Sequence, residues 1–354
     1  MKFHLNLFKN HSDVVGVAIG DAHVRALQLK GRLAAATVES YAEAVLPKTI
    51  FDAAGKIDVE GLAHLFENLF LKPAQGKFTT RDVAVNLPEA KCFVRVIHIA
   101  SMSDSEIEAA VPFEAESYIP VPIDQVYLDW QRLEEVDGKV ALLLVASPKE
   151  YVDQVLTAIR GANLTPVAVE VESQGLARAL VPDGTKENVL IADMKASGTD
   201  LIMIEHGSIQ FTSTIPVGGV AITDAIAHGL DVPAKRAEEI KAEAGLGSTE
   251  EYPNLKTLLV PVMNSFVAEI KQVMAFHDQH SQEKIAKLVL VGGSAGLKSL
   301  PEFLQESLDP SRSLLVELGD PTINVKVTLP SSISGTAVLP YTAALGLAMR
   351  GLSL

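Results

Sequence analysis

Two segments about half a chain apart share one pattern, and this repetition constrains the fold more than any other feature of the sequence. Residues 14–29 and residues 189–204 each consist of an apolar run, a short turn of small or polar residues, and a second apolar run. Such a pattern predicts a β-hairpin. Because the chain has 354 residues and the two segments begin about 175 residues apart (189 − 14), we expect an internal duplication in which a hairpin opens each half.

The chain between the hairpins predicts a compact α+β unit inserted into the first half, over roughly residues 86–165. Residues 103–118 form an acidic helix pattern, in which Ser103 is the N-cap and Glu106 completes a capping box. Ser147-Pro148-Lys149-Glu150 has the same pattern with proline at the first helical position, and it predicts a second helix. Strands are expected at 81–99, 125–132, 139–146 and 167–171.

The second half predicts a helical region followed by a glycine-rich turn. A charged helix at 232–244 and a long helix at 254–282 precede a strand at 287–291. That strand runs directly into Gly292-Gly293-Ser294-Ala295-Gly296. A last helix follows Pro340, and because it is apolar on most sides we expect it to be buried.

Composition limits the class of protein and its compartment. Hydrophobic residues make up 48% of the chain but aromatic residues only 5%, so the cores consist mainly of Val, Leu, Ile and Ala, as in α/β folds. The formal net charge of −14 argues against direct binding to nucleic acid or to an anionic membrane, because both require a basic patch. The single cysteine excludes a disulfide within one chain and suits a reducing compartment.

No membrane-targeting segment is expected. The first ten residues lack a long apolar stretch and a small-residue cleavage site, so they do not resemble a signal peptide. The longest uninterrupted apolar run, at 140–146, has 7 residues, whereas a spanning helix needs about 20. We therefore expect a soluble, cytoplasmic protein that reaches a membrane only through partners.

The order of these features resembles the fold shared by actin, sugar kinases and the ATPase domains of heat-shock chaperones. Residues 112–131 (Pro-Phe-Glu-Ala-Glu-Ser-Tyr-Ile-Pro-Val-Pro-Ile-Asp-Gln-Val-Tyr-Leu-Asp-Trp-Gln) resemble a segment of the type IV pilus assembly protein PilM family. In that segment a Glu-Ala-Glu helix precedes a Tyr-Ile-Pro-x-Pro turn and a Leu-Asp-aromatic strand. Residues 86–88, 215–219 and 291–297 match as well, so the resemblance covers about residues 13–350. The family is a relative of the cell-division protein FtsA.

The resemblance implies an α/β, actin-like (ribonuclease H-like, duplicated) fold with two lobes and an inserted small α+β subdomain. The first lobe is expected at 13–185, with the inserted subdomain at about 86–165. The second lobe is expected at 186–354, with a helical subdomain at about 220–285. The loop around 185–188 is the expected hinge between the lobes.

The resemblance also implies that a nucleotide, ATP or ADP, binds between the lobes. Tight turns expose backbone N–H groups that cradle phosphates, and the two hairpin turns are expected to face them. Glu238 and Lys241 would meet the ribose and base, although without the resemblance they read as a solvated helix face. The implied nucleotide-binding residues are Gly20, Asp21, Asp193, Lys195, Gly218, Gly219, Glu238, Lys241, Gly292, Gly293 and Ser294.

This chain departs from the family at one position in each hairpin. Ala18 stands where the family's first hairpin has an aspartate that helps to hold metal-bound waters, and Lys195 stands where the second hairpin has a glycine. Because Mg²⁺ usually needs one or two carboxylates beside the phosphates, we expect no metal site. Lys195 adds a positive charge where a cation is needed, and we expect nucleotide binding with little or no hydrolysis. The alternative is that Lys195 points to solvent and the cleft binds nothing.

The expected function is that of a scaffold and not of a metabolic enzyme. The resemblance implies binding of the N-terminal tail of a PilN-like bitopic membrane protein, in a cleft between the main part of the first lobe and the inserted subdomain. Other pilus platform and motor subunits are further implied partners, and the chain would be peripheral to the inner membrane through them. Two alternatives stay open: an active Mg²⁺-dependent actin-like ATPase or kinase, and a relative that serves secretion or cell division.

Three other features of the sequence are interpreted as structural and not as functional. Gly292-x-Ser294-x-Gly296 matches the nucleophile elbow of α/β-hydrolases, but that class needs a later histidine, and His280 is the last one. His277 and His280 are three residues apart on the long helix, where we expect an exposed face and not a metal site. Cys92 is expected to be buried and inert, and Glu170 and Glu172 to be strand and turn residues.

Overall fold

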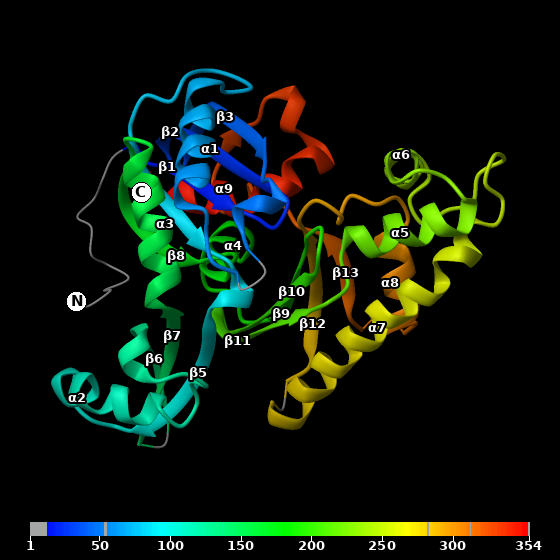
Figure 1. Cartoon of the computed structure of the whole chain (residues 1–354). Coiled ribbons are helices and arrows are strands. Elements are labelled where there is room, and N and C mark those ends of the chain that lie inside the picture. Colours follow the sequence, from blue (N-terminus) through cyan, green and yellow to red (C-terminus); the bar gives the residue numbers. More distant parts are fainter. Residues whose placement is uncertain (1–12, 53–54, 137, 282, 312, 353–354) are drawn as a thin grey trace.

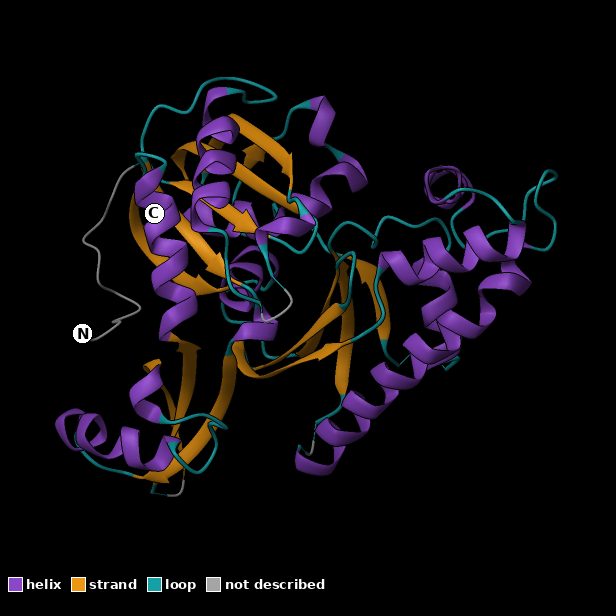
Figure 2. Cartoon of the chain, in the orientation of Figure 1, coloured by secondary structure: helices purple, strands orange, loops and turns teal. Residues whose placement is uncertain are grey.

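Two mixed β-sheets form the framework of the molecule, and helices flank both of them (Figure 2). The computed structural model describes residues 13–52, 55–136, 138–281, 283–311 and 313–352. The sheets are built largely from buried aliphatic residues, as the composition predicts.

The first sheet comes from the first half of the chain and one short strand near the C-terminus. Its strands are β1 (Val15–Ile19), β2 (His23–Arg32), β3 (Ala35–Val45), β4 (Asp82–Leu87), β8 (Thr165–Val171) and β14 (Val327–Thr328). Their order is β14-β3-β2-β1-β4-β8. β1 and β2 form the first predicted hairpin, in which Ile19 pairs with Val24, and β4 and β8 follow β1 in parallel.

The second sheet repeats this arrangement. Its strands from the second half are β9 (Asn188–Met194), β10 (Thr199–Glu205), β11 (Ser208–Ile215), β12 (Ile285–Val291) and β13 (Leu315–Leu318). β9, β10 and β11 are antiparallel neighbours, and β12 and β13 follow β9 in parallel. Each sheet therefore contains three antiparallel strands followed by two parallel ones, which confirms the duplication.

The inserted unit has its own core and extends the second sheet. It consists of β5 (Phe93–Ala100), α2 (Asp104–Ala115), β6 (Val126–Val136) and β7 (Lys139–Pro148). α2 packs Ile107 and Val111 against the strands, and Glu106 accepts hydrogen bonds from the backbone N and Oγ of Ser103, as the capping box predicts. The full order of the second sheet is β13-β12-β9-β10-β11-β5-β7-β6, and β5 joins β11 through one pair, Arg95 and Phe211.

Two helices on the first lobe share one core with its sheet. They are α1 (Val59–Leu71) and α3 (Lys149–Gly161). Phe66 of α1 and Val155 of α3 pack with Val17 of β1 in this core. In Figure 1, α1 and α3 lie side by side on the first lobe, and the inserted unit hangs below them.

Two further helices cross near the junction of the lobes. α4 (Glu172–Leu180) follows β8, and α9 (Thr342–Ala348) returns from the second half to pack on β1 and β2. A Cβ atom at Gly346 of α9 would lie 1.9 Å from the carbonyl oxygen of Gly175 in α4, so only glycine permits this approach. Every residue of α9 is buried, as predicted. Short 3-10 turns lie at Lys48–Ile50, Glu89–Lys91, Ile123–Gln125, Ser331–Ile333, Gly335–Tyr341 and Met349–Gly351.

Four helices of the second half cover the far side of the second lobe (Figure 1). They are α5 (Gly219–Leu230), α6 (Ala234–Ala244), α7 (Leu255–His280) and α8 (Leu300–Leu308). Among the described residues, α7 is the one helix long and apolar enough to cross a membrane by length and composition. Its buried residues, including Leu259, Phe266 and Ile270, recur every three or four positions and face the core, which is the pattern of a helix packed on a protein.

Candidate functional site

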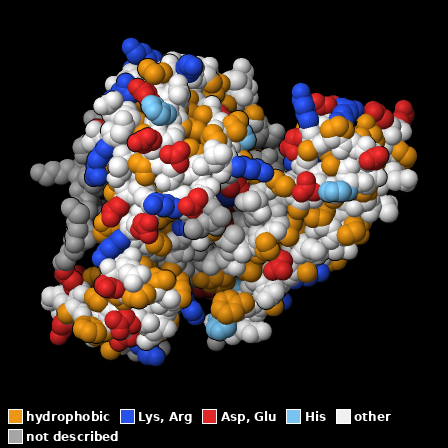
Figure 3. Space-filling model, viewed as in Figure 1, with side chains coloured by type: hydrophobic (Ala, Val, Ile, Leu, Met, Phe, Trp, Pro, Cys, Tyr) orange, Lys and Arg blue, Asp and Glu red, His pale blue; other side chains and the backbone are white. Residues whose placement is uncertain are grey.

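A cleft of about 730 Å³ opens where the two lobes face each other. The turn after β1 and the start of α4 line it from the first half. Five segments of the second half line it as well: the turn after β9, the start of α5, the end of α6, the glycine-rich turn after β12, and the 3-10 turn Gly335–Tyr341. The space-filling view shows a notch between the upper parts of the two lobes (Figure 3). Ligand sites commonly have volumes of roughly 300–1,000 Å³, so the cleft is large enough for a small molecule.

The structure brings ten of the eleven implied nucleotide-binding residues to this cleft. They are Gly20, Asp21, Asp193, Lys195, Gly219, Glu238, Lys241, Gly292, Gly293 and Ser294, and Ala18 lines the cleft too. Gly218 does not line the cleft. A Cβ atom there would lie 2.6 Å from the carbonyl oxygen of Ala196 and the nitrogen of Gly198, so Gly218 lets α5 start directly against the second hairpin turn.

The two hairpin turns contact each other across the mouth of the cleft. One carboxylate oxygen of Asp21 accepts hydrogen bonds from the backbone N and the Oγ of Ser197, at 2.5 Å and 2.6 Å. The other accepts from the backbone N of Ala196 at 3.3 Å. Asp21 therefore binds the second turn with its side chain, which the sequence did not indicate.

Lys195 lies among three buried carboxylates. Its Nζ atom contacts Glu172 Oε2 and Asp200 Oδ2 and lies 3.7 Å from Asp193 Oδ2. The lysine side chain is 15% exposed. Among the described residues, these carboxylates form the one acidic or histidine cluster tight enough to hold a metal ion. Because an ammonium group lies among them and Ala18 adds no carboxylate, the site does not fit a divalent metal.

The surroundings of Lys195 keep it charged. Burial lowers the pKa of Lys195, but attraction to Glu172, Asp193 and Asp200 outweighs burial and holds the pKa well above its usual value. Burial raises the pKa values of Glu172 and Asp193, and attraction to Lys195 opposes this rise. Lys195 is thus an internal cation that neutralises an acidic cluster, and the alternative in which it points to solvent is wrong.

The helix face with Glu238 and Lys241 is not simply solvated. Lys241 is 7% exposed, and its Nζ donates to the carbonyl oxygen of Gly219 at 3.1 Å and to Thr223 Oγ1 at 2.8 Å. Lys241 Nζ also lies 2.7 Å from Glu238 Oε1. The side chain of Glu238 is 59% exposed. This network holds α6 against the start of α5, and it presents the Glu238 carboxylate toward the cleft.

The glycine-rich turn after β12 permits close backbone contact. Gly292 has a φ of +90°, and a Cβ atom there would lie 2.4 Å from Asp193 Oδ1. A Cβ atom at Gly219 would lie 2.3 Å from Ser294 Oγ, whereas one at Gly293 would meet nothing within 4 Å. The turn therefore packs tightly on the second hairpin at Gly292 and leaves open space beside Gly293.

The charges of the cleft do not favour a polyphosphate. Arg25, Lys195 and Lys241 are its lysine and arginine residues, whereas five acidic residues line it: Asp21, Glu43, Glu172, Asp193 and Glu238. Like charges repel at short range, and burial strengthens the effect. The cleft thus fits a nucleotide by size and by its glycine turns, while its charges weaken binding of the phosphates.

Glu172 and Asp200 belong to the site, although neither was predicted as a member from the sequence. Glu172 was expected to be a turn residue, but it is the first residue of α4 and is buried. Asp200 pairs directly with Asp193 across the hairpin of β9 and β10, and directly paired residues project on the same face. The hairpin register was therefore the available signal for Asp200, while the signal for Glu172 was its place directly after the inserted unit.

His277 corrects a second expectation. Its side chain is 1% exposed, with Nε2 3.0 Å from Glu205 Oε1 and Nδ1 3.2 Å from Asp278 Oδ1. It continues the buried stripe of α7, because it follows Ile270 by two helical turns. His280 is exposed, as expected. Cys92 is half-buried beside Ser147, and burial raises the pKa of its thiol to about 12, which suits an inert thiol.

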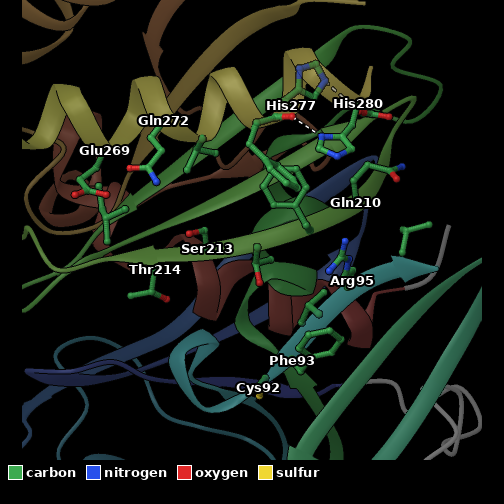
Figure 4. Close-up of a pocket in the computed structure, with 18 of the residues that line it drawn as sticks. Cys92, Phe93, Arg95, Gln210, Ser213, Thr214, Glu269, Gln272, His277 and His280 are labelled. Carbon is green, nitrogen blue, oxygen red and sulfur yellow. Dashed lines mark hydrogen bonds and ion pairs between the residues drawn. The ribbon is translucent and has the colours of Figure 1, made fainter. Parts of the chain in front are cut away.

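Two other hollows lie away from the cleft. One, of about 720 Å³, is bounded by β5, β11 and the C-terminal half of α7 (Figure 4). There the rings of Phe211 and Phe276 meet edge to face at 5.3 Å. None of the implied nucleotide-binding residues lines it.

The other hollow is a groove of about 430 Å³ between the edges of the two sheets. β8 ends the order of the first sheet and β6 ends that of the second. Leu133 of β6 and Arg178 of α4 are among the lining residues. Glu170 at one wall is 1% exposed and is bound by Arg178 and Arg350. Attraction to both arginines outweighs burial and lowers the pKa of Glu170, so the wall carries a stable buried ion pair and not an isolated charge.

Comparisons with known proteins agree with these features. A model of the family described as Type IV pilus assembly protein PilM matches residues 16–352. The cell division protein FtsA of Neisseria meningitidis is 26% identical over 196 residues, covering 49% of this chain and 47% of FtsA, so the chain spans about half the length of this relative.

Solved structures show the same fold. A chain of the PilM-PilN type IV pilus biogenesis complex is 25% identical, with a TM-score of 0.80 over 96% of this chain and 99% of that one. An MreB of Spiroplasma citri bound to AMPPNP is 12% identical, with a TM-score of 0.53 over 95% and 94% of the two chains. The predicted actin-like α/β fold is confirmed.

Proposed function

Because this chain belongs to the type IV pilus assembly protein PilM family, we propose that it is a cytoplasmic scaffold of the inner-membrane platform of a type IV pilus or a related secretion machine. It binds the cytoplasmic tail of a PilN-like membrane protein and thereby connects with other platform and motor subunits. Its similarity to a PilM chain from a PilM-PilN complex supports this role. A formal net charge of −14 suits attachment to the membrane through such partners and not through anionic lipid.

The groove between β6 and β8 is the proposed site of the tail. Its lining comes from the inserted unit, from β8 and α4 at the end of the first half, and from residues 207–209 and Arg350 of the second half. It therefore lies beside the junction of the inserted unit with the main part of the first lobe, where the family resemblance implies tail binding. An extended peptide can add to a terminal strand through its backbone while alternate side chains enter pockets. β6 is a terminal strand of its sheet. Its half-buried residue Leu133 lines the groove and offers an apolar contact to a bound peptide.

This proposal is tested with a peptide of the N-terminal tail of the cognate PilN-like protein. Leu133→Asp places a charge in the groove, whereas Leu315→Asp places the same charge on β13, the strand at the opposite end of the same sheet. We expect Leu133→Asp to weaken binding at least about tenfold, since a buried apolar side chain contributes about 1.5–3 kcal/mol. Fluorescence anisotropy measures the affinities, and equal weakening by both variants would count against the groove.

We further propose that the cleft binds ATP or ADP with little or no hydrolysis. The observation that carries the lack of hydrolysis is the position of Lys195, whose ammonium group lies among the carboxylates that would otherwise hold a cation. An ammonium ion supplies charge, but it does not lower the pKa of a bound water molecule as a metal ion does. The arrangement therefore lacks the metal chemistry of an active ATPase, while binding rests on the size of the cleft and on its glycine turns, and the chain regulates assembly instead of consuming nucleotide.

A further inference from the structure

The contact between Asp21 and the second hairpin turn has the geometry of an anion-binding site. The backbone N–H groups of Ala196 and Ser197 and the Ser197 hydroxyl all point at one carboxylate. Successive backbone N–H groups in a turn form a concave site for anions such as phosphate. In this chain the anion in that site is the carboxylate of Asp21, which comes from the opposite lobe and is 176 residues from Ser197 along the sequence.

A second contact joins the same two parts of the chain at the base of the cleft. Lys195, from the second hairpin turn, contacts Glu172 at the start of α4. Each contact pairs one charge with its chemical complement, a carboxylate with N–H donors and an ammonium with carboxylates. Together they supply internally the two charges that a metal-bound phosphate would bring.

We propose that Asp21 is an internal anion that latches the lobes together in the absence of ligand and competes with phosphate groups for the second hairpin turn. The competition with phosphate groups rests on the proposed nucleotide binding. The contact of Asp21 that holds the lobes together, which we call the latch, does not depend on it. The cleft then accepts an uncharged nucleoside without disturbing the latch. A nucleoside diphosphate or triphosphate must displace the Asp21 carboxylate, so phosphate binding and release of the latch are one event.

The position of Asp21 makes this exchange feasible. Asp21 and Ser197 are both exposed at the mouth of the cleft, so the carboxylate can leave the turn and be hydrated without any rearrangement of a core. Lys195 is different, because it is mostly buried and bound to carboxylates that are themselves buried. The latch can therefore open at Asp21 while the contact at the base stays closed.

Hydrogen exchange of the ligand-free protein tests the latch directly. Asp21→Ala removes the acceptor from the amides of Ala196 and Ser197. Asp320→Ala is the matched control, because Asp320 accepts from the backbone N and Oγ of Thr322 in the same way but within one loop. We expect exchange at residues 196–197 to accelerate at least about fivefold in Asp21→Ala, as for the loss of a hydrogen bond of about 1 kcal/mol, and to be unchanged in Asp320→Ala. Unchanged exchange in Asp21→Ala overturns the proposal.

Calorimetry with ADP and with adenosine, both in EDTA, tests the competition. We expect the affinity for ADP relative to adenosine to rise about tenfold in Asp21→Ala and by a smaller factor in Asp21→Asn, which keeps an acceptor but removes the charge. An unchanged ratio in both variants overturns the competition. If neither ligand binds any variant, the proposed nucleotide function fails, and the exchange measurement still decides whether the latch exists.

Discussion

At the scale of single residues, the junction of the lobes contains more buried acid than the sequence suggests. Lys195 neutralises part of the acidic cluster, and it also attracts the nearby carboxylate of Glu89, but its charge is the weakest of the influences on Glu89. Glu89 is 3% exposed and accepts hydrogen bonds from the backbone N and Oγ of Ser173. Burial raises the pKa of Glu89 to about 7, so this carboxyl group titrates near neutral pH.

The raised pKa of Glu89 predicts a pH dependence of stability. The folded protein keeps the proton up to about pH 7, whereas the unfolded chain loses it near pH 4.3. The folded state thus binds more protons between these values, and the free energy of unfolding falls by up to about 4 kcal/mol as pH rises through that window, then levels off. Glu89→Gln cannot ionise and should lack this fall.

Urea unfolding at pH 5 and pH 8 measures the effect. We expect the stability of Glu89→Gln relative to the parent to rise by about 2.5 kcal/mol from pH 5 to pH 8, while Glu60→Gln, at an exposed position on α1, should follow the parent at both. Identical pH dependence in the parent and in Glu89→Gln would show that Glu89 does not titrate in this window.

At the scale of elements, local patterns located most helices but misplaced one start. Ser147-Pro148-Lys149-Glu150 predicts an N-cap at Ser147, yet β7 runs through Pro148 and α3 begins at Lys149. The Ser147 hydroxyl lies 3.0 Å from Cys92 Sγ instead of capping the helix. Pairing of β7 with β5 and β6 extends the strand into the motif, and this tertiary pairing outweighs the local capping preference.

The crossing of α4 and α9 predicts an asymmetric response to two similar substitutions. A methyl group at Gly346 would meet the backbone of Gly175 at 1.9 Å, whereas one at Gly175 would approach Ala343 no closer than 3.4 Å. We expect Gly346→Ala to lower the free energy of unfolding by about 1–3 kcal/mol through overpacking, and Gly175→Ala to be near neutral, since alanine favours a helix. Thermal or urea unfolding compares the two, and equal effects would show that the crossing can relax.

At the scale of the whole molecule, the duplication explains why two hairpin turns meet at one cleft. Each half begins with a hairpin, and packing of α4 against α9 brings the two hairpins face to face. Residues far apart in sequence thereby form one site.

Isothermal titration of the whole chain with ATP tests this site. Because Lys195 already lies among Glu172, Asp193 and Asp200, we expect the affinity measured with Mg²⁺ and with EDTA to agree within about twofold, a difference below 0.5 kcal/mol. Binding that requires Mg²⁺, or ordinary ATP turnover that Lys195→Ala leaves unchanged, would favour the ATPase alternative. Absence of binding under both conditions would leave a scaffold without a nucleotide.

The duplicated α/β plan, the order of elements and the family could be predicted from local periodicity, glycine turns and a specific segment at 112–131, which depend on neighbours along the chain. Ten of the residues that line the cleft were predicted through the family resemblance. Only the tertiary structure decided that β5 extends the second sheet, that His277 is buried, and that Gly218 supports a turn instead of lining the cleft. It alone decided the partners of Asp21 and Lys195. The contact of Lys195 with Glu172 joins residues 23 positions apart and that of Asp21 with Ser197 joins residues 176 positions apart. The energy of such a charge depends on what surrounds it in space, which local sequence patterns do not specify.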